Sequence, residues 1–177
     1  YAANGNITSK SDAGSFDYTT QQAGCSYTGL SPQPHAVRKA GSTVFCYDKN
    51  GNMTSRGGNT ISWYSYNQPN LINSGTNSTQ FEYNANHQRW KQTAIDGTGT
   101  TRTWYIGGLM EKLERPGSVI EYRHMIPAGS GTAIYMRKPD GTNSTTYVTT
   151  DHLGSGDLIL DSAANVLAKM SFTPFGA

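Results

Sequence analysis

Few residues in this chain have types and spacings suited to chemistry. Four histidines are present, and no pair of them has the spacing of metal ligands. They are His35, His87, His124 and His152. His124 would lie on the same face of a strand as its apolar neighbours two residues away, so we expect it to be packed there. The sequence therefore predicts neither a bound metal ion nor a cofactor.

One short motif contains the residue types of a hydrolase. Asp151-His152-Leu153-Gly154-Ser155 holds a carboxylate, an imidazole and a hydroxyl in one run. Neighbours along a strand or turn point in different directions, so three of them rarely converge as a catalytic triad does. Gly154-Ser155-Gly156 also lacks the strand-to-helix context of a nucleophile elbow. We therefore expect the chain not to be an enzyme.

The two cysteines, Cys25 and Cys46, fit no zinc or redox motif. A disulfide between them would close a loop and contribute roughly 3 kcal/mol on the loop-entropy model. The alternative is a pair of free, half-buried thiols. Nothing in the sequence indicates that the two sulfur atoms meet, so the free thiols are expected.

Aromatic side chains raise the possibility of carbohydrate binding. Rings near Asn, Asp and Arg can stack on sugars while the polar groups bind the hydroxyls. The candidates are Trp63, Tyr64, Trp90, Trp104 and Tyr105. The same rings would also serve as the packing surface of a β-sheet. A carbohydrate-binding or adhesive module on the cell surface is therefore the alternative to a purely structural role.

The composition indicates a folded chain of short strands. Hydrophobic residues make up 35% and charged residues 15%, and Thr, Tyr and Gly are abundant. Low charge argues against disorder, and this mixture is typical of strands joined by tight turns. The net charge is +2 and the basic residues are scattered, so no nucleic-acid partner is expected. No apolar run is long enough to span a bilayer.

Internal repetition is the clearest signal in the sequence. The segment 1–10 is echoed by the segment 47–56, with the same Tyr, Asn-Gly-Asn and Thr-Ser residues. Looser copies begin at Tyr66 and Tyr83. The spacing between successive aromatic residues is about the length of one hairpin. The repeat predicts one β-hairpin for each copy.

Turn signals agree with this spacing. Asn4-Gly5 and Asn50-Gly51, with Asp96-Gly97 and Asp140-Gly141, predict two-residue hairpin turns, because Asn and Gly tolerate positive φ. A single hairpin is too small to bury its apolar face, whereas stacked hairpins share one sheet. We therefore predict an all-β fold: a curved antiparallel sheet of stacked hairpins. Its open edges would favour self-association.

Two motifs resemble those of a known family. Tyr47-Asp48-x-x-Gly51-x-Met53 resembles the YD repeat, with Tyr1 beginning a partial copy. Asp151 to Ser155, followed by Pro174-Phe175-Gly176, is similar to the start of the RHS-associated core. Asn165 stands where the family pattern has Gly, and Phe172-Thr173 stands where it has Tyr-Asp.

The resemblance implies an organisation and a role. Residues 1–150 would be a YD-repeat array and residues 151–177 the truncated start of the core. The array would be an open segment of a hollow β-shell enclosing a C-terminal toxin or effector domain. The parent would be a secreted or cell-surface bacterial protein. The chain stops before the autoproteolytic segment with catalytic aspartates found in many members. Repeat residues such as Tyr47 and Asp48 would have structural roles.

Overall fold

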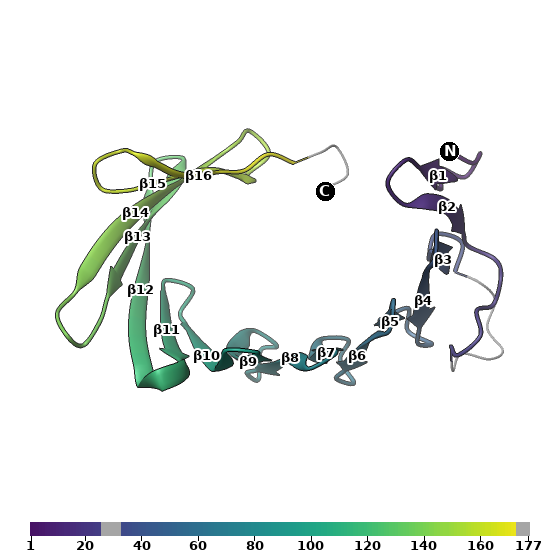
Figure 1. Ribbon diagram of the computed structural model, residues 1–177, viewed down its shortest axis with the longest axis horizontal. Coiled ribbons are helices and arrows are strands. Elements are labelled where there is room, and N and C mark those ends of the chain that lie inside the picture. Colours follow the sequence, from purple (N-terminus) through teal and green to yellow (C-terminus); the bar gives the residue numbers. More distant parts are fainter. Residues whose placement is uncertain (26–32, 173–177) are drawn as a thin grey trace. The chain divides into compact units, whose positions relative to one another are not determined.

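The computed structural model describes residues 1–25 and 33–172 and shows an all-β chain. The strands follow one another in the sheet in the order of the sequence (Figure 1). Consecutive strands pair antiparallel wherever a register is defined, for example β4 with β5 and β12 with β13. The predicted architecture of antiparallel hairpins is therefore confirmed. Pro174, Phe175 and Gly176 lie outside the described residues.

The chain divides into two compact units. The first comprises Tyr1–Glu82 and Ala94–Gly97, and the second comprises Tyr83–Thr93 and Thr98–Ala177. The strands mainly in the first unit are β1 (Ser9–Lys10), β2 (Gly14–Asp17), β3 (Lys39–Ala40), β4 (Thr43–Tyr47), β5 (Met53–Arg56), β6 (Asn59–Trp63), β7 (Pro69–Ser74) and β8 (Asn77–Tyr83).

Two-residue turns in the first unit occur at positions other than those predicted. Gly41-Ser42 joins β3 to β4, Gly57-Gly58 joins β5 to β6 and Gly75-Thr76 joins β7 to β8. The first glycine of each has a φ near +60°: 56°, 56° and 61°. Hairpin turns of this length need that conformation because it matches the twist of the strands.

The second unit contains longer strands. They are β9 (Arg89–Asp96), β10 (Gly99–Ile106), β11 (Met110–Arg115), β12 (Val119–Ala128), β13 (Gly131–Arg137), β14 (Asn143–Thr150), β15 (Gly156–Leu160) and β16 (Val166–Lys169). A 3₁₀ turn, η1 (Pro116–Ser118), joins β11 to β12 at the predicted Pro-Gly turn. No helix in the described part of the chain is long and apolar enough to cross a membrane.

Neither unit has a conventional core. Among the described residues the buried apolar side chains are Leu113 and Ala133, which are 5% and 9% exposed, and none is below 2%. Most strand residues are half-buried instead. A sheet with no second layer packed on it leaves both faces partly in contact with water. Stability in such a fold comes from contacts between neighbouring hairpins.

Candidate functional site

A five-residue turn recurs where the sequence repeat was expected. In each copy the first residue's N–H donates to the fifth residue's carbonyl, and the fourth residue's N–H donates to the first residue's carbonyl. The fourth residue always has a positive φ. We call this the repeat turn. Its copies in the described residues are 2–6, 48–52, 64–68, 84–88, 138–142, 151–155 and 161–165.

This geometry corrects the prediction of two-residue turns at three Asn-Gly or Asp-Gly pairs. Gly5, Gly51 and Gly141 are each the fourth residue of a repeat turn, with φ values of 83°, 88° and 88°. A loop of this length places a left-handed residue after a type I turn, where it forms a bulge. The glycine still adopts the positive φ without strain, but it closes a longer loop.

Asp48 shows what an acidic first residue adds. Its Oδ1 accepts the N–H groups of Asn50 and Asn52, each at 2.9 Å, and its Oδ2 accepts the Asn52 side-chain amide at 2.9 Å. Burial opposes ionisation, but these hydrogen bonds outweigh it and hold the pKa of Asp48 below its usual value. Asp48 therefore acts as a hydrogen-bond acceptor within its own turn, which is a structural role of the kind expected.

The Asp-His-Leu-Gly-Ser motif is another repeat turn. Asp151 Oδ1 accepts the N–H groups of Leu153 at 2.8 Å and Ser155 at 2.9 Å, and Gly154 has a φ of 86°. The carboxylate is thus occupied by its own turn, as at Asp48. The next turn begins at Asp161, whose pKa is lowered by hydrogen bonds from the side chain and backbone of Asn165.

The aromatic residue before a repeat turn anchors it to an earlier segment. The Tyr47 hydroxyl donates to the Val37 carbonyl at 2.9 Å. The indole N–H of Trp63 donates to the Met53 carbonyl at 2.8 Å, which is again ten residues earlier. Trp63 therefore occupies the place of Tyr47 in the next copy. Tyr83 likewise directly precedes the turn that begins at Asn84.

The expected repeat position at Tyr66 is wrong. Tyr66 lies inside the turn 64–68, where its ring stacks on that of Tyr64 with centroids 5.1 Å apart. Sequence inspection missed Trp63 because its turn has neither an acidic first residue nor a glycine. Asn67, with a φ of 60°, takes the glycine's place, and its Oδ1 accepts amides from Asn50 and Asn52 at 3.1 and 2.9 Å. Adjacent turns are thereby linked.

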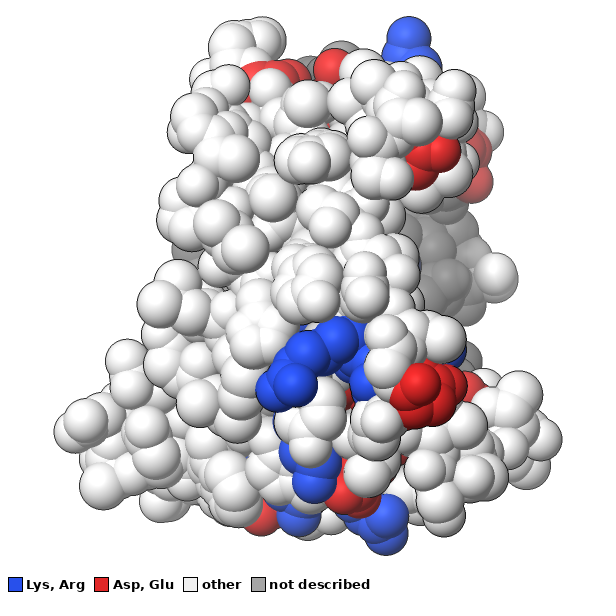
Figure 2. Space-filling model, turned by 90° about the vertical axis from the view of Figure 1, so that its left-hand side faces the viewer, with Lys and Arg blue, Asp and Glu red and all other residues white. Residues whose placement is uncertain are grey.

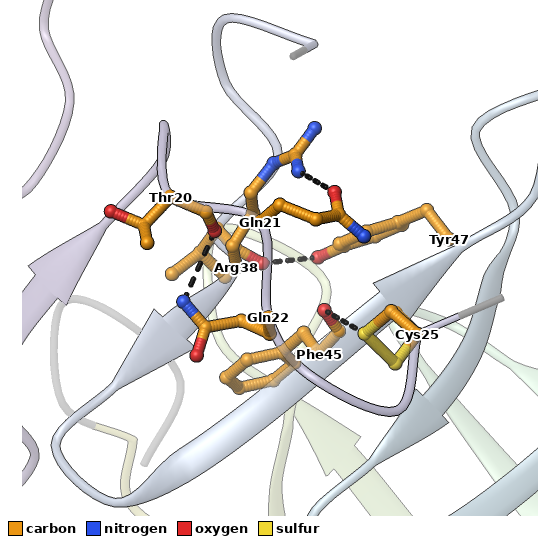
Figure 3. Close-up of a disulfide and its surroundings, with 9 residues drawn as sticks. Thr20, Gln21, Gln22, Cys25, Arg38, Phe45 and Tyr47 are labelled. Atoms are coloured by element: carbon orange, nitrogen blue, oxygen red, sulfur yellow. Dashed lines mark hydrogen bonds between the residues drawn. A yellow bond between two sulfur atoms is a disulfide. The ribbon is translucent and has the colours of Figure 1, made fainter. Parts of the chain in front are cut away.

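Cys25 and Cys46 form a disulfide, which corrects the expectation of free thiols. Figure 3 shows the bridge beside Phe45 and Tyr47 on β4, with Gln22 on the facing loop. Cys46 is on a strand, and its partner lies in the connection between β2 and β3. The face to which Cys46 points depends on its position along the strand, and the position of Cys25 depends on the path of the loop. The number of residues between the two cysteines therefore does not show whether their thiols meet.

The five candidate sugar-binding rings are divided between the two units. Trp63 and Tyr64 belong to the first unit, and the other three belong to the second. Trp104 and Tyr105 are neighbours on β10 and so lie on opposite faces. Arg89 lies over the Tyr105 ring at 4.5 Å, and the Tyr105 hydroxyl bonds to Gln92 at 3.1 Å. Tyr105 is thus engaged in contacts within its own unit.

A row of alternating rings and cations crosses the second unit. The strand registers place Trp104 opposite Lys112, Lys112 opposite Tyr122, and Tyr122 opposite Arg137. Lys112 Nζ lies 4.9 Å from the Trp104 ring centre, and Arg137 Cζ lies 5.0 Å from that of Tyr122. We call these four residues the cation–ring row. The cation–ring row could not be predicted from the sequence, because its four residues come from four different strands.

The other face of the same strands carries a neutral charge cluster. Glu121 is 8% exposed, and its Oε2 lies 3.2 Å from Arg115 Nε and 3.3 Å from an Arg123 guanidinium nitrogen. Glu111 is paired opposite Arg123 in the β-ladder. Each arginine thus has a carboxylate nearby. In the described residues no group of three or more His, Cys, Asp or Glu side chains has a geometry that could hold a metal ion.

The fold defines a class: a β-hairpin repeat sheet built on a recurring turn. Neither a known protein-family pattern nor a curated relative matches the sequence. Solved structures do match. The crystal structure of TcdB2-TccC3-Cdc42 superposes with a TM-score of 0.63 at 16% identity, over 73% of this chain. That of TcdB2-TccC3 without its hypervariable C-terminal region gives 0.57 at 13%, over 81%.

The likeness to these structures shows that this chain shares their fold, and it supports the RHS/YD relationship drawn from the sequence motifs. The chain spans 7% and 9% of the two matched chains. It therefore corresponds to a small part of such an assembly.

Proposed function

We propose that this chain is a non-catalytic wall segment of a hollow β-shell, and that the shell encloses a C-terminal toxin or effector domain of its parent protein. The carrying observation is the single-layer sheet, in which both faces remain partly exposed and almost no side chain is buried. A wall between an interior and the outside solvent has this organisation. The shared fold with toxin-complex shell proteins supports the same role.

The repeat turns fit a wall because they make each hairpin depend on its neighbour. Asn67 accepts hydrogen bonds from the preceding turn, and Trp63 donates to the Met53 carbonyl on the earlier strand β5. Contacts between successive hairpins let a sheet extend without a central core. The carboxylates of Asp48 and Asp151 accept backbone N–H groups of their own turns, so these oxygens are already engaged in hydrogen bonds.

The disulfide supports the proposal that the parent protein is secreted. Disulfides form and persist in oxidising surroundings outside the cytosol. Cys25–Cys46 joins a loop to a strand in a unit with little buried surface, where a covalent link adds stability that the core does not supply. Open sheet edges would also let wall segments pair. A sedimentation profile that stays monomeric at high concentration would contradict such pairing.

Protease protection tests enclosure. The parent protein and its separated C-terminal domain are digested side by side, and the domain is expected to survive only within the parent. Gly131→Ala is the wall-opening variant, because a Cβ there would lie 2.5 Å from the Val148 carbonyl oxygen on the adjacent strand. Gly97→Ala is the matched control, because its Cβ would meet nothing within 4 Å and its φ is not positive.

We expect Gly131→Ala to shorten the lifetime of the C-terminal domain under protease while Gly97→Ala leaves it unchanged. Equal digestion of the domain inside and outside the parent would refute enclosure. The sequence that follows residue 177 in the parent gene gives a second test. A core segment with paired aspartates and then an unrelated domain is expected, and a membrane anchor there would favour an adhesive protein.

A further inference from the structure

We infer that the face of the second unit bearing the cation–ring row binds an acidic polypeptide segment. The inference starts from the different surroundings of the cationic side chains on the two faces of β11 and β12. Arg115 and Arg123 lie against Glu121 on one face, where opposite charges cancel. Lys112 and Arg137 lie over aromatic rings on the other face.

A ring holds a cation without neutralising it. The attraction comes from the ring's quadrupole, so the ammonium or guanidinium keeps its full charge and most of its N–H donors. Lys112 also forms an ion pair with Glu114 at 2.9 Å, which offsets its charge, but Arg102 lies opposite Glu114 in the β-ladder and adds a further cation to this face. Cations therefore outnumber carboxylates on this face, and Arg137 is exposed at one end of the row. Figure 2 shows Lys and Arg side chains gathered in one region of the face it presents, next to a few acidic groups.

The geometry selects among anionic partners. Nucleic-acid bases and sugars bind aromatic residues through open ring faces. The faces of Trp104 and Tyr122 are already covered by Lys112 and Arg137. Carboxylates, like phosphates and sulfates, reach the outward N–H groups of the cations directly, so the covered rings argue only against stacking of bases and sugars. Ile106 and Ile126, which share this face and are 47% and 50% exposed, offer apolar contacts that a polypeptide can use and a polysaccharide cannot.

Fluorescence anisotropy with the full chain tests this. The probe is a labelled oligoglutamate peptide, compared with oligoglutamine of equal length, single-stranded DNA and a sulfated polysaccharide. The test variant is Lys112→Gln/Arg137→Gln. The control is Lys39→Gln/Lys49→Gln, which removes the same charge from exposed sites in the first unit. Thermal melts establish that both variants are folded.

We expect oligoglutamate to bind the native chain and the control alike, and the test variant about threefold to tenfold more weakly, since each exposed ion pair contributes modestly. Added salt should weaken binding to the native chain. Equal affinity of both variants, or no oligoglutamate binding to the native chain, would overturn the inference. Binding of DNA or the sulfated polysaccharide in preference to oligoglutamate would overturn it too. If the test variant proves unfolded, Arg137→Gln alone replaces it, because this residue is exposed at the end of the row.

Discussion

Replacing Asp48 with alanine tests whether the repeat turn is stabilised by its first side chain. The substitution removes three hydrogen bonds to the carboxylate, from the N–H groups of Asn50 and Asn52 and from the Asn52 amide, each 2.9 Å long. Bonds to an ionised acceptor contribute about 1.5–3 kcal/mol when shielded, but here water can replace the lost partner. We therefore expect the free energy of unfolding to fall by about 1–2 kcal/mol.

Asp48→Asn is the matched control. It keeps the oxygen that accepts the two backbone N–H groups, and Asn84 shows that asparagine works there: its Oδ1 accepts Asn86 N–H at 2.9 Å and Gln88 N–H at 3.0 Å. The free energy of unfolding of Asp48→Asn should fall by less than half as much as that of the alanine variant. Urea unfolding followed by circular dichroism measures both. An alanine variant as stable as the native chain, or an asparagine variant equally destabilised, would refute the reasoning.

The same carboxylate gives a pH dependence. The pKa of Asp48 is lower in the folded chain than in the unfolded chain, so its contribution is present above the unfolded pKa of about 3.9. That contribution is lost as the pH falls through the lower folded value. The difference in unfolding free energy between the native chain and Asp48→Ala should therefore be full at neutral pH and become smaller, without vanishing, as the solution becomes strongly acidic, because the protonated carboxyl can still accept the backbone N–H groups as asparagine does. A gap that does not change with pH would show that the ionised form is not what matters.

Four further outcomes are expected. Replacing Cys25 and Cys46 with serine should lower stability by about 3 kcal/mol on the loop-entropy model, as measured by urea unfolding of the native chain and the variant. Glu121→Gln should cost about 1–3 kcal/mol, because its two arginine partners lose the carboxylate they share, and the midpoint of thermal unfolding should fall. Ala164→Gly should stabilise the chain by about 1 kcal/mol because Ala164 has a φ of 63°, whereas Ala163→Gly should bring no gain in the same assay. A glycan array should show no binding, and a specific signal there would revive the carbohydrate alternative.

The repeat was visible in the sequence only where the turn carries its most permissive residues. Gly5 and Gly51 supply positive φ without strain, so Asn-Gly marked their turns. Asn67, His87 and Ala164 adopt nearly the same conformation, with φ values of 60°, 58° and 63°. In those copies the pairing of the flanking strands imposes the backbone geometry, and the local residue only has to tolerate it. Turn propensity therefore marked the copies that carry glycine, whereas the copy after Tyr83 was found only by the spacing of its aromatic residue and the copy after Trp63 was missed.

The alternation of residues along single strands was predictable, whereas their partners on other strands were not. The sequence places Tyr122 and His124 on one face of β12, and the register confirms this by pairing them with Lys112 and Met110. Which residue lies opposite depends on the length of every intervening loop, and one residue more or less would turn a strand over. Because Arg137 reaches Tyr122 only through that register, the cation–ring row is a property of the assembled sheet. A register shift of one residue between β12 and β13 should therefore move Arg137 to the opposite face from Tyr122 while leaving both strand sequences intact.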